Sequence, residues 1–362
     1  MPSQTTVLVA ESDEELAKVL TLAIAGHGWS VLQARDAVSA TATILRHRPD
    51  AVVLNQKLPG GGGLLVLRRL RASIHTAMTP VIAITGTRDG DQADLRQHGA
   101  DKCVTVPLDV GAIAEWVRKR LLTPTVVMEA PASIIRDPER LASLAQTGLM
   151  DTAPSEPLDA LTRVAASLLG VPVALVSLVD DQRQFFKSHF GLPEPWATAR
   201  ETPLTHSFCQ WVVADHNELI VSDARVHPAL KHNLALHEMN VIAYAGVPLT
   251  TTSGSAIGSF CAIDTKARTW SGDEIRILKE LASVADACTA FSEFDSAAGD
   301  LGAGAEMADV RRAATVRAAG EAMAQLSAIF GCDRPNFGAD QRHELVTLMG
   351  WLGRQLMRVA GT

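Results

Sequence analysis

Five short apolar runs, each followed by an amphipathic stretch, occupy the first 120 residues of this 362-residue chain. The runs are rich in valine, isoleucine and leucine, and polar residues do not alternate with the apolar ones. A strand that is apolar on both sides is covered on both faces, so the pattern predicts a parallel sheet between two layers of helices. Functional side chains of such sheets gather at the carboxyl ends of the strands. The expected strands are residues 5–10, 29–34, 51–54, 81–84 and 103–105.

Three short motifs refine this prediction, namely Leu58-Pro59-Gly60, Thr85-Gly86 and Gly99-Ala100-Asp101. With the order of strands and helices, they make residues 5–120 resemble a response-regulator receiver domain. The resemblance implies an α/β doubly wound, flavodoxin-like domain over residues 1–120. It also implies a site at the end of the third strand, where the family phosphorylates an aspartate four residues before the proline. That position is Asn55 here.

The receiver resemblance further implies that phosphotransfer is lost. An amide is not a nucleophile toward a phosphoryl donor, and the acidic pair that holds Mg²⁺ in the family is reduced to Glu11-Ser12. Val106 stands where the family has a lysine, and Thr85 alone remains of the switch residues. We therefore expect a pseudo-receiver that serves as a folding unit and protein-docking surface. The alternative is an altered ligand site formed by Glu11, Asp13, Asn55 and Thr85, in which Asp13 binds a cation weakly.

A second pattern follows a linker at residues 121–136, which we expect to be semi-extended. Asp137-Pro138-Glu139 predicts a helix start, and further strands near 171–179, 184–188, 219–221, 241–249 and 256–263 predict a mostly antiparallel α+β domain. The phrases at 181–187, 202–209, 245–249 and 257–264 make residues 137–294 resemble a GAF domain. This resemblance implies a module for small-molecule sensing or for dimerisation.

The GAF resemblance does not name a ligand. The residues that could border a pocket are Phe185, Phe186, Trp196, His206, Cys209 and Tyr244. The aromatic residues among them could equally well pack in the hydrophobic core. The Cys-His attachment pair of phytochrome-type chromophores and the Asn-Lys…Phe…Asp-Glu pattern of cyclic-nucleotide binders are both missing. We expect no cofactor and no metal. Cys209, in an expected helix at 203–214, and Cys261 could be redox-sensing thiols, but we predict that they are small buried hydrophobes.

Four histidines are also predicted not to bind a metal ion. His227, His232 and His237 fall five apart on an expected helix, so no single face collects them. His206 is predicted to be a hydrogen-bonded helix residue.

The C-terminal part is predicted to be helical. Ser271 and Glu274 form a capping box, and a 4-3-4-3 apolar seam follows at Ile277, Leu281, Val284, Cys288 and Phe291. The seam packs on its own sheet or pairs with a second chain. After a break at 294–304, residues 305–362 form a helical hairpin tail that docks on the GAF domain or dimerises. Residues 343–347 loosely resemble the phosphoacceptor box of histidine kinases.

Composition excludes several function classes. With 33 basic and 40 acidic residues the chain has a net charge of −7, so we expect no nucleic-acid binding. No apolar run reaches the ~18–20 residues of a membrane helix, so we expect no membrane insertion. Five widely spaced cysteines fit reduced thiols and a cytoplasmic protein. Since no catalytic motif is found, we predict a non-catalytic signalling adaptor that binds signalling proteins. The alternatives are a small-molecule sensor and a phosphorelay element using His343.

Overall fold

The computed structural model describes residues 5–86, 89–122, 129–298, 305–330 and 338–360. The chain divides into two compact units, Met1–Ser133 and Ile134–Thr362. Each unit buries hydrophobic residues of its own. None of the helices that the structure describes combines the length and the hydropathy needed for a membrane span.

The first unit contains a five-stranded sheet in which every pair of neighbouring strands is parallel. The strand order is β2-β1-β3-β4-β5, which is the flavodoxin-like order. The predicted fold class of this part is therefore confirmed. The strands are β1 (Thr6–Ala10), β2 (Ser30–Ala34), β3 (Ala51–Asn55), β4 (Val81–Thr85) and β5 (Lys102–Thr105).

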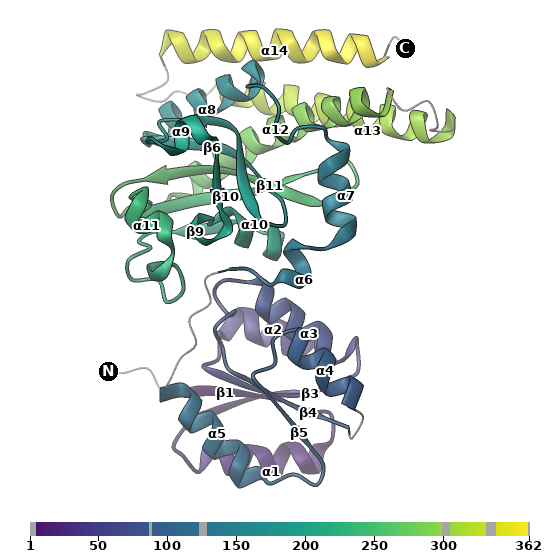
Figure 1. The fold of residues 1–362 in the computed structure, drawn as a ribbon, viewed down its shortest axis with the longest axis vertical. Coiled ribbons are helices and arrows are strands. Elements are labelled where there is room, and N and C mark those ends of the chain that lie inside the picture. The colour runs from purple at the N-terminus through teal and green to yellow at the C-terminus, as the bar shows by residue number, and fades with distance from the viewer. Residues whose placement is uncertain (1–4, 87–88, 123–128, 299–304, 331–337, 361–362) are drawn as a thin grey trace. The chain divides into compact units, whose positions relative to one another are not determined.

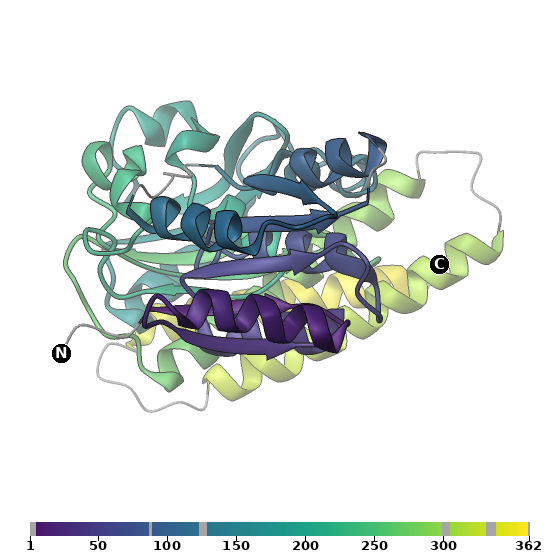
Figure 2. The ribbon, with the colours of Figure 1, turned by 90° about the horizontal axis from the view of Figure 1, so that it is seen from below.

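Helices cover both faces of this sheet (Figures 1 and 2). Val52 and Leu54 point to one face and pack against α2 and α3, whereas Val53 points to the other face and packs against α1 and α5. Successive strand residues thus enter two different cores, which is why the strands are apolar throughout. The helices are α1 (Glu14–Ala25), α2 (Ala37–His47), α3 (Gly62–Ala72), α4 (Asp89–Gln97) and α5 (Val110–Leu122).

The second unit is built on a six-stranded sheet in which all neighbouring strands are antiparallel. The order is β8-β7-β6-β11-β10-β9, as expected for the α+β domain. The strands are β6 (Val173–Val179), β7 (Arg183–Phe190), β8 (Glu201–Pro203), β9 (Leu219–Val221), β10 (Ala243–Thr250) and β11 (Ala256–Asp264). The helices before and between them are α6 (Ala132–Ile135), α7 (Pro138–Gln146), α8 (Glu156–Leu169), α9 (Trp196–Ala199), α10 (Cys209–Asp215) and α11 (Leu234–Glu238).

Three long helices complete the second unit, and they share one core with the sheet. They are α12 (Gly272–Ala298), α13 (Ala305–Phe330) and α14 (Ala339–Ala360). The predicted capping box is present, since Ser271 N–H donates to Glu274 Oε2 at 2.8 Å and Glu274 N–H donates to Ser271 Oγ at 3.2 Å. All five residues of the predicted seam are buried within the chain.

The helical tail packs on the rest of the second unit. Figure 1 shows α14, in yellow, running along α13, and α14 also contacts α8. Trp351 meets Phe291 of α12 edge to face, with the ring centroids 5.6 Å apart. Arg358 forms a two-pronged ion pair with Asp295 at 2.7 and 3.0 Å. The apolar stripes of α12 and α14 are therefore occupied inside one chain.

Two predicted helices are broken by capping side chains. Residues 203–214 were expected to form one helix, but Ser207 is extended and its Oγ accepts from Gln210 N–H at 3.0 Å, so α10 begins only at Cys209. The helix expected to carry His227, His232 and His237 is replaced by a 3₁₀ turn (Leu230–His232) and α11. Asn233 separates them, since its side chain accepts from Ala235 N–H at 3.0 Å.

The two expected irregular segments also contain helix. The linker at 121–136 was expected to be semi-extended, yet α5 continues to Leu122 and α6 occupies Ala132–Ile135, while 123–128 lie outside the described residues. The break was expected from residue 294, but residues 294–298 belong to α12, which continues to Ala298, and its Asp295 is held by Arg358. Residues 299–304 and 331–337 lie outside the described part, including most of the turn expected after α13.

Candidate functional site

The candidate site of the first unit lies at the carboxyl ends of β1 and β3. Glu11 directly follows β1 and is buried, and Asn55 is the last residue of β3. Asn55 Nδ2 donates to Glu11 Oε2 at 2.7 Å, and the backbone N–H of Asp13 donates to Glu11 Oε1 at 3.0 Å. Both oxygens of the Glu11 carboxylate are thus hydrogen-bonded within the chain.

The Asn55 amide is hydrogen-bonded on its other side as well. Its Oδ1 accepts from the backbone N–H of Lys57 at 2.8 Å, while the Lys57 side chain is exposed. The amide therefore bridges a carboxylate and a backbone donor. It presents no ionisable group at the position that a phosphoryl donor would approach.

The other predicted residues of this site are dispersed. Ser12 and Asp13 are exposed, and Asp13 Oδ1 caps α1 by accepting from Leu16 N–H at 2.8 Å. Thr85, at the end of β4, is buried and donates its hydroxyl to the side-chain oxygen of Gln56. Val106 is exposed and carries no charge. Sequence reasoning missed Gln56, which links β3 to β4 here; its only signal was its position after Asn55.

Among the residues that the structure describes, no group of three or more His, Cys, Asp or Glu side chains is arranged to hold a metal ion. At the strand-end site, the two carboxylates already accept hydrogen bonds within the chain. Glu11 accepts from Asn55, and Asp13 accepts from the first turn of α1.

The second candidate site lies inside the second unit, where α10 covers β10 and β11. Cys209 Sγ lies 3.3 Å from Tyr244 Oη and 3.9 Å from Cys261 Sγ. Tyr244 Oη is 3.2 Å from Ser259 Oγ, and the Tyr244 ring lies 5.3 Å from that of Phe208. Cys209, Tyr244, Ser259 and Cys261 are all buried.

A glycine makes room for the tyrosine in this cluster. Gly246 is two residues after Tyr244 on β10, so both face the same side of the sheet. A Cβ atom at Gly246 would lie 2.2 Å from Tyr244 Oη, so only glycine lets the ring lie along the strand.

Burial and hydrogen bonds shift the pKa values of the ionisable side chains in this cluster. Burial raises the pKa values of Tyr244 and Cys261 well above their usual range. Burial also opposes ionisation of Cys209, but hydrogen bonds from Cys261 and Tyr244 outweigh it and lower the pKa of Cys209. Cys209 is therefore the more acidic of the two thiols.

The residues predicted to border a GAF pocket fall into separate places. Cys209 and Tyr244 lie together, as described, and Phe186 is completely buried. Trp196 and His206 stack obliquely at 5.2 Å, and His206 Nε2 lies 3.0 Å from Glu238 Oε2. Phe185 faces the core that packs on α8 and α12, with the Arg200 guanidinium 5.0 Å from its ring centroid. Sequence reasoning missed the pairing of Cys209 with Cys261, which are 52 positions apart.

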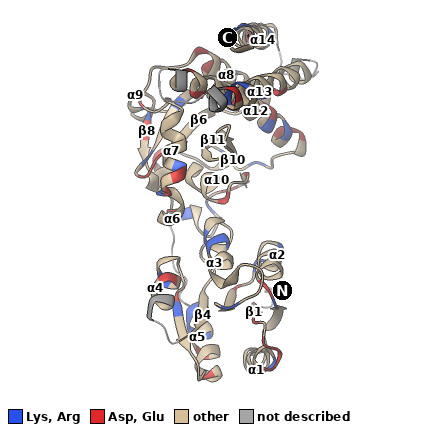
Figure 3. Ribbon diagram, turned by 90° about the vertical axis from the view of Figure 1, so that its right-hand side faces the viewer, with Lys and Arg blue, Asp and Glu red and all other residues tan. Residues whose placement is uncertain are grey.

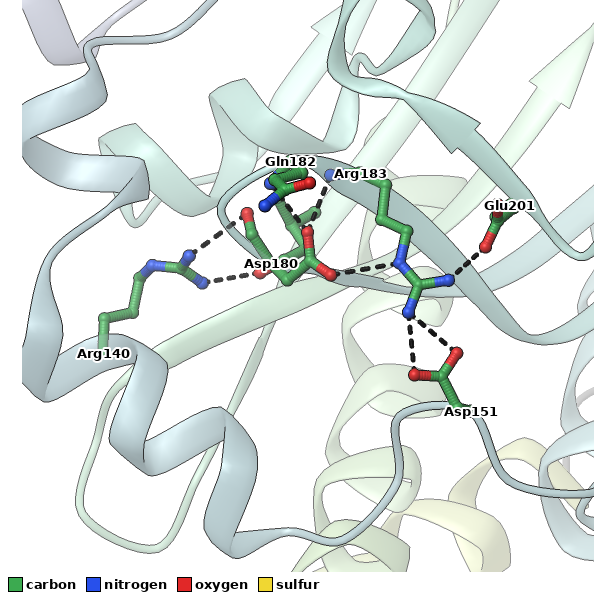
Figure 4. A network of polar contacts seen from close by, with 7 residues as sticks. Arg140, Asp151, Asp180, Gln182, Arg183 and Glu201 are labelled. Carbon is green, nitrogen blue, oxygen red and sulfur yellow. Dashed lines mark hydrogen bonds and ion pairs between the residues drawn. The ribbon is translucent and has the colours of Figure 1, made fainter.

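A polar network at the start of β7 also escaped sequence reasoning, although it lies in the phrase 181–187. Figure 4 shows the Arg183 guanidinium between Asp180, Asp151 and Glu201, with ion pairs of 3.2 Å to Asp180 and 2.7 Å to Asp151. Burial lowers the pKa of Arg183, but the hydrogen bonds that Arg183 donates to these carboxylates outweigh it and raise the pKa. Arg140 donates to the backbone oxygen of Val179 at 2.7 Å. Arg183 pairs with carboxylates and Arg140 with backbone oxygens at the end of β6, and together they fix the β6–β7 turn.

His343, the candidate phosphorelay residue, is exposed on α14. It borders a cavity of about 460 Å³ between α8 and α14, together with Glu344, Arg163 and Trp351. Arg163 Nε donates to Glu344 Oε1 at 2.5 Å, which ties α8 to α14 beside the histidine.

Comparisons with known proteins agree with this architecture. The family model of the response regulator receiver domain matches residues 7–118, and that of the GAF domain matches residues 154–287. A cyclic di-GMP phosphodiesterase of Pseudomonas aeruginosa is 34% identical over 130 residues, 36% of this chain and 21% of that protein. TcrX of Mycobacterium tuberculosis is 35% identical over 118 residues, 32% of this chain and 49% of TcrX. The chain thus spans less than half the length of these two relatives.

The solved structures that resemble the chain include receiver domains. One is the receiver domain of a DNA-binding response regulator from Colwellia psychrerythraea, 24% identical, with a TM-score of 0.32; the match covers 33% of this chain and 100% of that one. Another is the receiver domain of a Pseudomonas aeruginosa sensor histidine kinase with a magnesium ion in its active-site cleft. It is 21% identical with a TM-score of 0.32, and the match covers 33% of this chain and 100% of that one. The chain is thus a signalling protein that carries a response regulator receiver domain at residues 7–118, followed by a GAF domain at residues 154–287.

Proposed function

We propose that the chain is a non-catalytic signalling adaptor whose receiver domain binds proteins without being phosphorylated. The observation that carries this proposal is the hydrogen bond of 2.7 Å from Asn55 Nδ2 to Glu11 Oε2. A neutral donor thereby satisfies a buried carboxylate that would otherwise need a cation or another donor.

The surroundings of Asn55 add two further supports. A phosphoryl group gains its stability in protein sites from metal ions and basic side chains that neutralise its charge. Here Val106 is apolar, Lys57 extends into solvent, and Thr85 is engaged by Gln56. A phosphoryl group at this position would therefore lack both its acceptor atom and its charge partners.

The outer surface of α2 and α3 supports protein binding. Val38 and Leu45 lie seven residues apart on one side of α2, and both are exposed, as is Leu65 of the neighbouring helix α3. Four exposed arginines lie on or next to these two helices, and the charged residues of α3 are all arginines (Figure 3). An exposed apolar strip with basic residues around it suits a partner with an acidic, partly apolar contact surface. The arginines are Arg46, Arg48, Arg68 and Arg69.

The first prediction is that the receiver domain does not accept phosphate. When the full chain is incubated with acetyl phosphate and Mg²⁺, intact-mass measurement should show no gain of about 80 Da, the mass of one phosphoryl group. Asn55→Asp should recover little, because Val106 and Ser12 still leave the charge partners missing. A receiver domain with an intact aspartate serves as the positive control. A stable adduct on the unmodified chain would contradict the proposal.

The second prediction concerns the partner. The tagged full chain should capture the same signalling protein from its host's lysate with and without acetyl phosphate. Capture should fall at least about tenfold in Leu45→Asp, because a charge in the centre of an apolar contact costs more than about 1.4 kcal/mol of binding free energy. Leu22→Asp on α1, at a leucine that is exposed to 73% where Leu45 is exposed to 52%, is the control and should retain binding. Capture that depends on acetyl phosphate would contradict binding without phosphorylation.

The third prediction is that the protein forms a homodimer through the C-terminal helices. Because the stripes of α12 and α14 are filled within the chain, the contact we propose is the remaining side of α14. There, Val346 and Met357 are exposed and lie eleven residues apart, three helical turns along one side. Light scattering at micromolar concentration should give the mass of a dimer, and Val346→Asp should give that of a monomer. If the full chain is monomeric, the dimer prediction is wrong and α14 packs only within its own chain.

A further inference from the structure

Two thiols that are far apart in the sequence lie next to each other inside the GAF domain. The Sγ atoms of Cys209 on α10 and Cys261 on β11 are 3.9 Å apart. Only 2% of Cys209 and 0% of Cys261 is exposed. A single buried cysteine usually acts as a small hydrophobe, but an oxidant can join two adjacent thiols in a disulfide.

The surroundings of this pair are unusually polar for a domain interior. Tyr244 Oη lies 3.3 Å from Cys209 Sγ, and Ser259 Oγ lies 3.2 Å from Tyr244 Oη. Ser177 stands opposite Ser259 in the register of β6 and β11, and both side chains are fully buried. Buried hydroxyls cost stability unless they are hydrogen-bonded, so a purely structural core would be better filled with apolar side chains.

We propose that Cys209 and Cys261 form an oxidation site, a dithiol that a small hydroperoxide such as hydrogen peroxide converts into a disulfide joining α10 to β11. This role is separate from protein binding by the receiver domain. It would make the interior of the GAF domain responsive to oxidants.

The chemistry balances in two steps. The Cys209 thiolate attacks one peroxide oxygen; an S–O bond forms, the O–O bond breaks, and the leaving hydroxide takes up the thiol proton as water. The resulting sulfenic acid is attacked at sulfur by Cys261; the S–S bond forms, the S–O bond breaks, and a second water leaves. Two thiols are oxidised and one hydroperoxide is reduced by two electrons.

The positions of the groups assign the two roles. Cys209 is the attacking thiol because Tyr244 can donate its hydroxyl to the thiolate, and because hydrogen bonds lower the pKa of Cys209. Cys261 is the resolving thiol, since burial raises its pKa and it lies within van der Waals reach of Cys209. The sulfurs must approach by about 2 Å to bond, so disulfide formation requires α10 and β11 to move closer together.

The test uses the reduced full chain. After treatment with hydrogen peroxide, the remaining thiols are alkylated with N-ethylmaleimide under denaturing conditions, and the protein is digested with trypsin. Cleavage after Arg200, Arg225, Lys231 and Lys266 places Cys209 in peptide 201–225 and Cys261 in peptide 232–266. Mass spectrometry should find these two peptides joined, and dithiothreitol should separate them.

Variants assign the roles and provide a matched control. Cys209→Ser and Cys261→Ser should each abolish the joined peptides, and only Cys261→Ser should accumulate a sulfenic acid on Cys209 that dimedone traps. Cys288→Ser is the control, because Cys288 is also buried and burial raises its pKa to about 12. It should leave the joined peptides unchanged. Oxidation of the partly buried Cys103 without the Cys209–Cys261 link, or links in random pairings, would overturn the proposal.

Discussion

Leu352→Ala in α14 is expected to lower the free energy of unfolding of the second unit by about 2–5 kcal/mol, the usual effect of removing a large aliphatic side chain from a packed core. Leu352 is 0% exposed and belongs to the core that α8, α12 and the GAF sheet share. Truncation at this position leaves a cavity between α14 and the rest of the unit. Urea unfolding followed by tryptophan fluorescence measures the change, since Trp351 and Trp270 are both in this unit.

Met357→Ala provides the matched control for this prediction. Met357 lies on the same helix but is 69% exposed, so its truncation should change the free energy of unfolding by no more than about 0.5 kcal/mol. If Leu352→Ala were as mild as Met357→Ala, α14 would not be packed on its own chain. Because Met357 belongs to the dimer contact proposed above, both variants are compared at a concentration at which the chain is monomeric, so that the pair reports only on packing within the chain.

The sequence predicted the receiver fold well because the signals there are local. Apolar runs such as 51–54 lie on strands almost as expected, since burial on both faces leaves a continuous hydrophobic pattern. The end of β3 was therefore placed correctly, and with it the position of Asn55. What Asn55 contacts could not be predicted, because its partner Glu11 is 44 positions away and the hydrogen bond depends on how β1 and β3 pair.

In the second unit, more of the structure depends on contacts between segments that are far apart in the sequence than in the receiver domain. The spacing of the seam from Ile277 to Phe291 fitted both a dimer and a helix packed on its own sheet, since either partner needs the same apolar stripe. Likewise, the pairing of Cys209 with Cys261 follows from the placement of α10 across the sheet, which no periodicity in the sequence encodes. Ser207 and Asn233 cap the starts of α10 and α11, and so divide two segments that were each expected to be one helix.

Asp286→Asn is expected to remove a pH dependence of stability from the second unit. Asp286 lies on α12, and its carboxylate accepts from Thr250 N–H at 2.8 Å and from Thr250 Oγ1 at 3.0 Å. Burial raises the pKa of Asp286 from 3.8 to about 7, even though these hydrogen bonds act to lower it. Glu293 on the same helix adds to the rise, and Arg317 and Glu321 of α13 border the same cavity of about 180 Å³.

The direction of the effect follows from proton binding. The folded chain keeps the Asp286 proton up to about pH 7, whereas the unfolded chain releases it near pH 3.8, so the folded state binds more protons between these values. The free energy of unfolding therefore falls as the pH rises through this window. A shift of this size corresponds to at most about 4 kcal/mol, and we expect about 1–3 kcal/mol because the side chain is partly exposed.

Urea unfolding at pH 4, 6 and 8 measures this difference. At pH 8, Asp286→Asn should be more stable than the unmodified chain by about 1–3 kcal/mol, because the variant has no carboxylate to ionise in the buried position. At pH 4 the two proteins should agree within about 0.5 kcal/mol, since the carboxyl group is then mostly protonated in the folded chain. Asp273→Asn, at an exposed carboxylate of the same helix, should leave the pH profile unchanged. Equal slopes for the unmodified chain and Asp286→Asn would mean that Asp286 stays ionised in the folded protein, held by Thr250 despite its burial.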